Sequence, residues 1–143
     1  MKTIAMLLFT LIMGKGCSGN SADLALAKIT YTAQSRGVNK VIIIQNKNIT
    51  VESGRGKEAT IATATISEGD WSELARKFEK MDLEKIETYA DPSQERFYDG
   101  AAIANLTVEY NGKTYRSKDF DHGNPPNELK AIVDQIFSLI SEK

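Results

Sequence analysis

Alternating apolar and polar positions dominate the first half of the chain. Residues 29–33 place Ile, Tyr and Ala on one side of two threonines, a period of two that predicts a strand with one buried face. Residues 41–44 form a continuous β-branched run, which is typical of a strand buried on both faces. Residues 49–51 and 60–66 read as two more strands, because turn-forming residues separate them from their neighbours. Four strands are therefore predicted first.

The period then changes to that of a helix. Ser67 stands at the expected N-cap with Asp70 three residues later, a variant of the capping box. An apolar stripe at helical spacing follows, with charged residues on the other side of the helix. This stripe consists of Trp71, Leu74, Ala75, Phe78 and Met81. We expect Trp71 and Phe78 to pack in the core.

A pair of strands and a second helix complete the pattern. Residues 102–110 alternate, and Asn111-Gly112 supplies the two positive-φ positions of a type I′ turn. The return strand is predicted over residues 113–120. Asn124 is the expected cap of the last helix, with Pro125 at the first helical position, where its missing N–H costs nothing.

This order of elements defines the expected fold. Four strands, a helix, a hairpin and a helix fit one largely antiparallel sheet of about six strands with two helices packed on one face, which is an α+β fold. The chain has 143 residues, of which 41% are hydrophobic and 26% charged, as in an ordinary globular protein. We expect one domain over residues 27–143, long enough to bury a core.

The first residues have a different composition. Residues 1–20 contain no acidic side chain, and Lys2 precedes an apolar run over residues 4–13. A positive start, a short apolar stretch and small residues after it are typical of a secretory signal peptide. Ten residues rise only about 15 Å as a helix, roughly half the thickness of a bilayer core, so the run is too short to span a membrane.

Cys17, the only Cys of the chain, directly follows this segment, and Gly14 and Gly16 precede it. The arrangement resembles a bacterial lipoprotein precursor, in which the Cys at the end of the lipobox is lipidated and becomes the mature N-terminus. Lys15, and the absence of Leu three positions before Cys17, depart from the preferred pattern. The resemblance implies a signal peptide over residues 1–17, a tether over 18–26 and an exported, membrane-anchored domain that faces the periplasm or the cell exterior.

Two alternatives to lipidation remain at this point, a plain secretory signal with an incidental Cys and an uncleaved anchor. The rest of the chain also resembles small bacterial lipoproteins of uncharacterised function, through residues 91–101 and 120–126. That resemblance implies no specific activity.

Charge and residue counts exclude several function classes. The net charge is −1, and it becomes −3 without residues 1–17, so no basic surface for nucleic acid is expected. A mildly acidic domain does not adhere to an anionic membrane by charge, so the lipid would supply the attachment. One Cys and one His exclude an intrachain disulfide, Cys-pair zinc motifs and double-His motifs. We expect no cofactor.

Two polar loops, at residues 91–100 and 119–124, flank the predicted hairpin. The register of that hairpin brings both loops to the same end of the sheet, where their side chains could converge. The candidate ligand or interaction residues are Asp91, Arg96, Tyr98, Asp99, Asp119, Asp121 and His122.

The loops allow a structural and three functional interpretations. Asp and Asn before Pro or Gly are turn formers, and Arg96 could simply bridge the acidic residues. Tyr and Arg are enriched at binding hot spots, which favours an interaction surface for a protein or small ligand. Carboxylates could instead hold Ca²⁺, or could act with His122 in acid–base catalysis. The leading hypothesis is a non-enzymatic binding domain, and the metal-dependent or enzymatic domain is the alternative.

Overall fold

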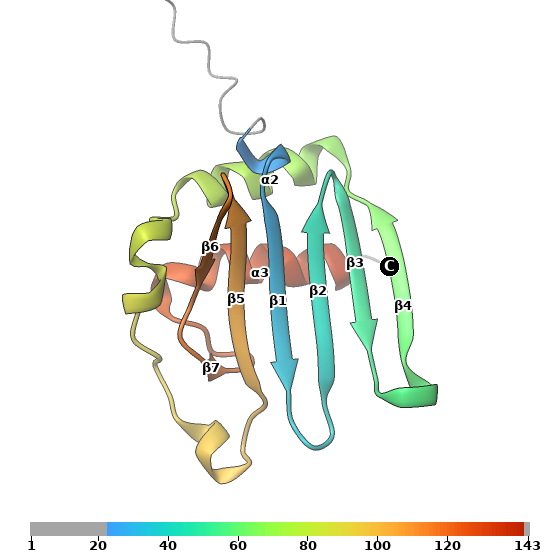
Figure 1. Cartoon of the computed structure of the whole chain (residues 1–143), viewed down its shortest axis with the longest axis vertical. Helices are drawn as coiled ribbons and strands as arrows, with labels where there is room; N and C mark the ends of the chain where they lie inside the picture. Colours follow the sequence, from blue (N-terminus) through green and yellow to red (C-terminus); the bar gives the residue numbers. More distant parts are fainter. Residues whose placement is uncertain (1–22, 142–143) are drawn as a thin grey trace, which may run out of the picture.

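The computed structural model describes residues 23–141, which form an open sheet with helices on one face (Figure 1). Strands are connected in the spatial order β4-β3-β2-β1-β5-β6, and every pairing is antiparallel. The strands are β1 (Lys28–Gln34), β2 (Asn39–Gln45), β3 (Asn48–Ser53), β4 (Thr60–Thr65), β5 (Ile103–Tyr110), β6 (Lys113–Arg116) and β7 (Phe120–Asp121). The predicted α+β class with a largely antiparallel sheet is confirmed.

Within the described part of the chain, the helices α2 and α3 and three short 3₁₀ helices connect and cover these strands. The helices are α2 (Glu68–Glu79), α3 (Asn127–Ser141), η1 (Gly56–Glu58), η2 (Leu83–Thr88) and η3 (Glu95–Tyr98). Helix α3 crosses behind the sheet, and α2 packs against it near the end at which residue 23 lies (Figure 1). Within residues 23–141 no helix is long and apolar enough to cross a membrane.

The core lies between the helices and one face of the sheet. Trp71 is only 2% exposed and its helix begins as predicted, with Ser67 Oγ accepting a hydrogen bond from the Asp70 N–H at 3.2 Å. The other face of the sheet is uncovered by the described residues. Val41 and Ile43 are therefore half-buried on that face, and the prediction that this strand is buried on both faces was wrong.

The hairpin register is as predicted, but its return strand is interrupted. Tyr110 pairs with Lys113 across a turn in which Asn111 and Gly112 both have positive φ. The ladder ends at Arg116, because buried Ser117 turns its side chain inward and its Oγ accepts the Leu106 N–H at 2.9 Å. The chain rejoins β5 only at β7.

The start of the last helix and the first packed residue both differ from the prediction. The last helix begins at Asn127 and not just after Asn124. A proline disfavours the helical conformation in the residue before it, so Pro125 restricts Asn124 and Pro126 restricts Pro125. At the other end, Leu24 is 1% exposed within the core. Leu24, which was expected to belong to the tether, thus packs in the core, whereas Leu26 is 70% exposed. Cys17 and residues 18–22 lie outside the described residues.

Candidate functional site

A buried aspartate organises the first polar loop. Asp121 is 1% exposed, and its Oδ2 accepts hydrogen bonds from Ser93 Oγ at 2.5 Å and from the Glu95 N–H at 2.7 Å. Its Oδ1 accepts from the Arg96 N–H at 3.0 Å and from Arg96 Nη1 at 3.1 Å. N–H groups at the start of a helix have no partner within that helix. Asp121 therefore caps η3 from a distant part of the chain.

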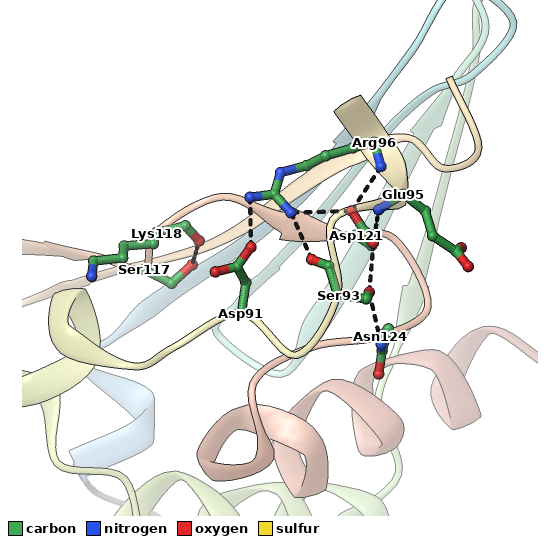
Figure 2. Close-up of polar contacts among 8 residues, drawn as sticks. All are labelled: Asp91, Ser93, Glu95, Arg96, Ser117, Lys118, Asp121 and Asn124. Atoms are coloured by element: carbon green, nitrogen blue, oxygen red, sulfur yellow. Dashed lines mark hydrogen bonds and ion pairs between the residues drawn. The ribbon is translucent and has the colours of Figure 1, made fainter. Parts of the chain in front are cut away.

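Arg96 connects this cap to a second carboxylate (Figure 2). Its Nη2 donates to Asp91 Oδ2 at 2.7 Å, and its Nη1 donates to the Ser93 carbonyl at 3.0 Å. The Arg96 side chain is only 9% exposed. A planar guanidinium can serve two carboxylates at once, which an ammonium group does poorly. The predicted pairing of Arg96 with the acidic loops is confirmed, and its partners are Asp91 and Asp121.

Hydrogen bonds determine the charge state of this network. Burial raises the pKa of Asp121, but the bonds from Ser93, Arg96 and Glu95 outweigh burial and lower that pKa to about 2. The hydrogen bond from Arg96 lowers the pKa of Asp91. Burial by itself lowers the pKa of Arg96, but the two carboxylates more than compensate and raise it. All three groups are charged at neutral pH, so the network fixes the loop and is not suited to proton transfer.

Two aromatic side chains project from the turn that this network holds. Phe97 is 66% exposed and Tyr98 is 86% exposed, and both belong to η3. The Arg96 guanidinium carbon lies 4.5 Å from the centre of the Phe97 ring, a cation–π contact. A hollow of about 360 Å³ lies between residues 99–102, which follow Tyr98 in the chain, and the turn that joins β1 to β2. We call Phe97 and Tyr98 the aromatic tip.

His122 lies in a different environment from its neighbour Asp121. Its Nδ1 is 2.8 Å from the Oη of Tyr31, a side chain fully buried in β1. Burial lowers the pKa of His122, and the positive charge of Lys40 lowers it further. Burial also raises the pKa of Tyr31, although a backbone hydrogen bond at Gly123 opposes that rise. His122 is therefore uncharged at neutral pH, and its ring shares a hydrogen bond with the buried Tyr31 hydroxyl, which is a packing role.

The structure does not bring the remaining candidates into this cluster. Asp119 accepts a hydrogen bond from Arg116 Nη2 at 2.7 Å, in an exposed pair between β6 and β7. Asp99 has φ 57° and ends η3 in the left-handed conformation, which Asp tolerates better than most residues. Asp99 is thus a turn residue, as the structural interpretation of the sequence expected, whereas Asp119 forms a local ion pair.

The arrangement limits what chemistry the loops can perform. Within residues 23–141 no group of three His, Cys, Asp or Glu side chains is placed to hold a metal ion. The Asp121 oxygens, which would be the natural ligands, already accept four hydrogen bonds from protein donors. The same bonds leave Asp121 without a lone pair directed at a substrate. The loops form a filled polar cluster, whereas the metal and acid–base hypotheses need an open one.

Sequence reasoning missed several residues of this region. Ser93 joins the two loops, since its Oγ donates to Asp121 and accepts from Asn124 Nδ2 at 2.8 Å. Its position after Pro92 marked it only as a turn residue. Phe97 was not among the candidate residues, because nothing in the pattern distinguishes an exposed aromatic from a buried one in a loop.

Comparisons with known proteins do not assign this site to a family. No protein-family model matches the chain, and no curated protein resembles its sequence significantly. The function must therefore be inferred from the chain's own residues.

Proposed function

We propose that the chain is an exported, lipid-anchored cell-envelope protein whose domain binds a partner protein through the aromatic tip. The apolar run at residues 4–13, followed by Cys17, supports export and anchoring. An anchor formed by a diacylglycerol group and an N-acyl chain holds a protein on a membrane stably, which a single acyl chain does not. The N-terminal resemblance to lipoprotein precursors is the basis for this part of the proposal.

The observation that carries the binding role is the exposure of two aromatic rings on a fixed turn. Phe97 and Tyr98 leave most of their surface in solvent, although η3 is capped by buried Asp121 and braced by buried Arg96. Aromatic and Arg side chains dominate the energetics of protein interfaces. A turn that is already ordered loses less conformational entropy on binding than a flexible loop does.

Two further exposed apolar side chains lie at the same end of the sheet. Val38, in the turn between β1 and β2, is 38% exposed, and Ile103, at the start of β5, is 46% exposed. Both occupy the end of the sheet that carries η3, which is the opposite end from residue 23 (Figure 1). An anchor attached through the N-terminal segment thus leaves the aromatic tip accessible to a partner.

Site-specific photo-crosslinking tests this role. A photoreactive phenylalanine analogue in place of Tyr98 is expected to give a discrete protein adduct in intact cells. The same analogue in place of Lys113, an exposed residue of the hairpin at the other end of β5, should give none. Phe97→Ala in the chain that carries the analogue at position 98 should weaken the adduct. Equal labelling from both positions, or no adduct from position 98, would contradict the proposal.

A further inference from the structure

Strand β4 forms an edge of the sheet with unusual composition. Within residues 23–141 it pairs with β3 alone, and its six residues (TIATAT) contain neither a charge nor a proline. Five of the six are exposed, and Ile61 is 71% exposed. Natural proteins protect edge strands with charges, prolines, bulges or covering segments, because unpaired backbone groups template pairing with another chain. An unprotected edge of this length indicates a strand that has a partner.

The hydrogen-bond pattern fixes which backbone groups of β4 face outward. The Ile66 N–H donates to the Lys47 carbonyl at 2.7 Å, so this pair is hydrogen-bonded. Hydrogen-bonded pairs alternate along an antiparallel ladder, so residues 64, 62 and 60 direct their backbone groups to β3. Ile61, Thr63 and Thr65 direct theirs to the free edge. The Oγ1 atoms of Thr50 and Thr63 lie 3.1 Å apart, as expected for a non-hydrogen-bonded pair, whose side chains are closer.

We propose that β4 pairs antiparallel with β4 of a second copy, around a two-fold axis at Thr63. In this register Thr63 lies opposite its own equivalent, and Ile61 lies opposite Thr65 of the other copy. Each outward-facing residue then exchanges both backbone hydrogen bonds with an outward-facing residue. A register shifted by two residues leaves one outward-facing residue of each β4 without an outward-facing partner in the other β4. A shift by one residue turns the side chains of one copy to the wrong face.

The charges at the two ends of β4 favour the antiparallel orientation. Arg55 and Lys57 precede the strand together with a single acid, Glu58. Glu68 and Asp70 follow it, and Lys47 pairs with Glu68 at 2.6 Å. An antiparallel pair brings the basic end of one copy beside the acidic end of the other, whereas a parallel pair would place like ends together. The match is isologous, as a two-fold axis requires.

An apolar groove runs beside β4 on the helix side of the sheet. It is a hollow of about 220 Å³, and the small side chains of Ala62 and Ala64 leave it open. The end of α3 forms its other wall through Leu139 and Ile140. Around the proposed axis the grooves of the two copies face each other, so the interface gains an apolar layer beneath the paired strands. This layer distinguishes pairing with a second copy from backbone pairing with an arbitrary strand.

The proposed dimer is compatible with anchoring of both copies to one membrane. The two-fold axis stands perpendicular to the sheet, so the N-terminal ends point in opposite directions within the sheet plane. Both reach the same membrane when the sheet lies along it. The six residues from Cys17 to Asp23 span at most about 20 Å, which sets the reach of each anchor. The two aromatic tips then lie at opposite ends of the combined sheet.

Crosslinking in membranes tests the register directly. Thr63→Cys in the full chain should give a dimer with a short thiol-specific bismethanethiosulfonate linker, and a reducing agent should remove it. The matched control is Thr114→Cys, an exposed threonine on β6 at the opposite edge of the sheet. The unmodified chain measures any background from Cys17. Dimer formation from position 63 alone supports the proposal. An equal yield from positions 63 and 114, or an adduct of position 63 with a different protein, overturns it.

The oligomeric state gives a second, independent measurement. The full chain in detergent should sediment as a dimer, and Thr63→Lys should convert it to a monomer, because two ammonium groups would meet on the axis. Thr114→Lys should leave the dimer intact. Position 63 is exposed, so the substitution is compatible with the fold, and an unchanged circular dichroism spectrum verifies this. A wild-type chain that is monomeric, or a Thr63→Lys variant that remains dimeric, overturns the proposal.

Discussion

Replacement of Asp121 by Asn is the sharpest perturbation of the network that holds the aromatic tip. The substitution preserves the shape of the side chain but removes its charge and turns one acceptor oxygen into a donor group. Four donor groups surround the carboxylate, from Ser93, Glu95 and Arg96. An amide can accept from only one side. At least one backbone N–H and the guanidinium therefore lose their charged partner.

The expected loss of stability follows from these contacts. A hydrogen bond to a charged group contributes about 1.5–3 kcal/mol, and breaking a buried ion pair costs roughly 3–5 kcal/mol. Arg96 keeps its second carboxylate, Asp91, so Asp121→Asn should cost about 3 kcal/mol. Asp119→Asn is the matched control, since Asp119 forms an exposed pair with Arg116 and should change stability by less than about 1 kcal/mol.

The pKa of Asp121 adds a pH dependence of known sign. The unfolded carboxyl has a pKa of about 3.9, and the folded value is lowered to about 2. The stabilisation is therefore complete above about pH 4 and is lost as the pH falls through about 2. The difference between wild type and Asp121→Asn should be constant from pH 7 to pH 5 and should shrink below about pH 4.

Urea unfolding of residues 18–143 at several pH values, followed by Trp71 fluorescence, measures both effects. A loss below about 1 kcal/mol at pH 7, or equal losses for Asp121→Asn and Asp119→Asn, would show that the buried network contributes little. A difference that persists undiminished at pH 3 would refute the assignment of a low pKa to Asp121.

Three further predictions follow from the same structure. Trp71→Ala should cost about 3–5 kcal/mol in urea unfolding, because the ring is buried; a cost under 1 kcal/mol would mean that it is dispensable to the core. The pKa of His122 is lowered by burial and by Lys40, so stability should decrease as the pH falls below about 6.5, and His122→Asn should weaken this slope in thermal melts. Millimolar Ca²⁺ should leave the melting temperature unchanged, whereas a clear rise would revive the metal hypothesis.

Local patterns in the sequence predicted much of the fold. The dipeptide Asn111-Gly112 fixed both the turn type and the register of β5 with β6, because few residues tolerate two successive positive φ values. Ser67 with Asp70 marked the start of α2 for a similarly local reason. These turn and cap structures depend on neighbouring residues alone, so they form in the folded chain as the local sequence predicts.

Features that depend on distant contacts could not be predicted in the same way. The break after Arg116 arises because Ser117 bonds back to Leu106, eleven residues away. The cap on η3 comes from Asp121, which follows η3 by more than twenty residues. The pairing of Arg96 was predictable because it is the only basic residue inside the acidic loop, whereas the choice of Asp121 over Asp99 and Asp119 depends on the tertiary fold.

Intact mass spectrometry of the chain extracted from cell membranes tests the proposed anchoring most directly. The account predicts a single species that begins at Cys17, with its mass raised by a diacylglycerol group and an N-acyl chain. Cys17→Ser should abolish this species and release the chain from the membrane fraction. A mature chain that begins after Cys17, or one that retains residues 1–16 without lipid, would contradict the proposed function.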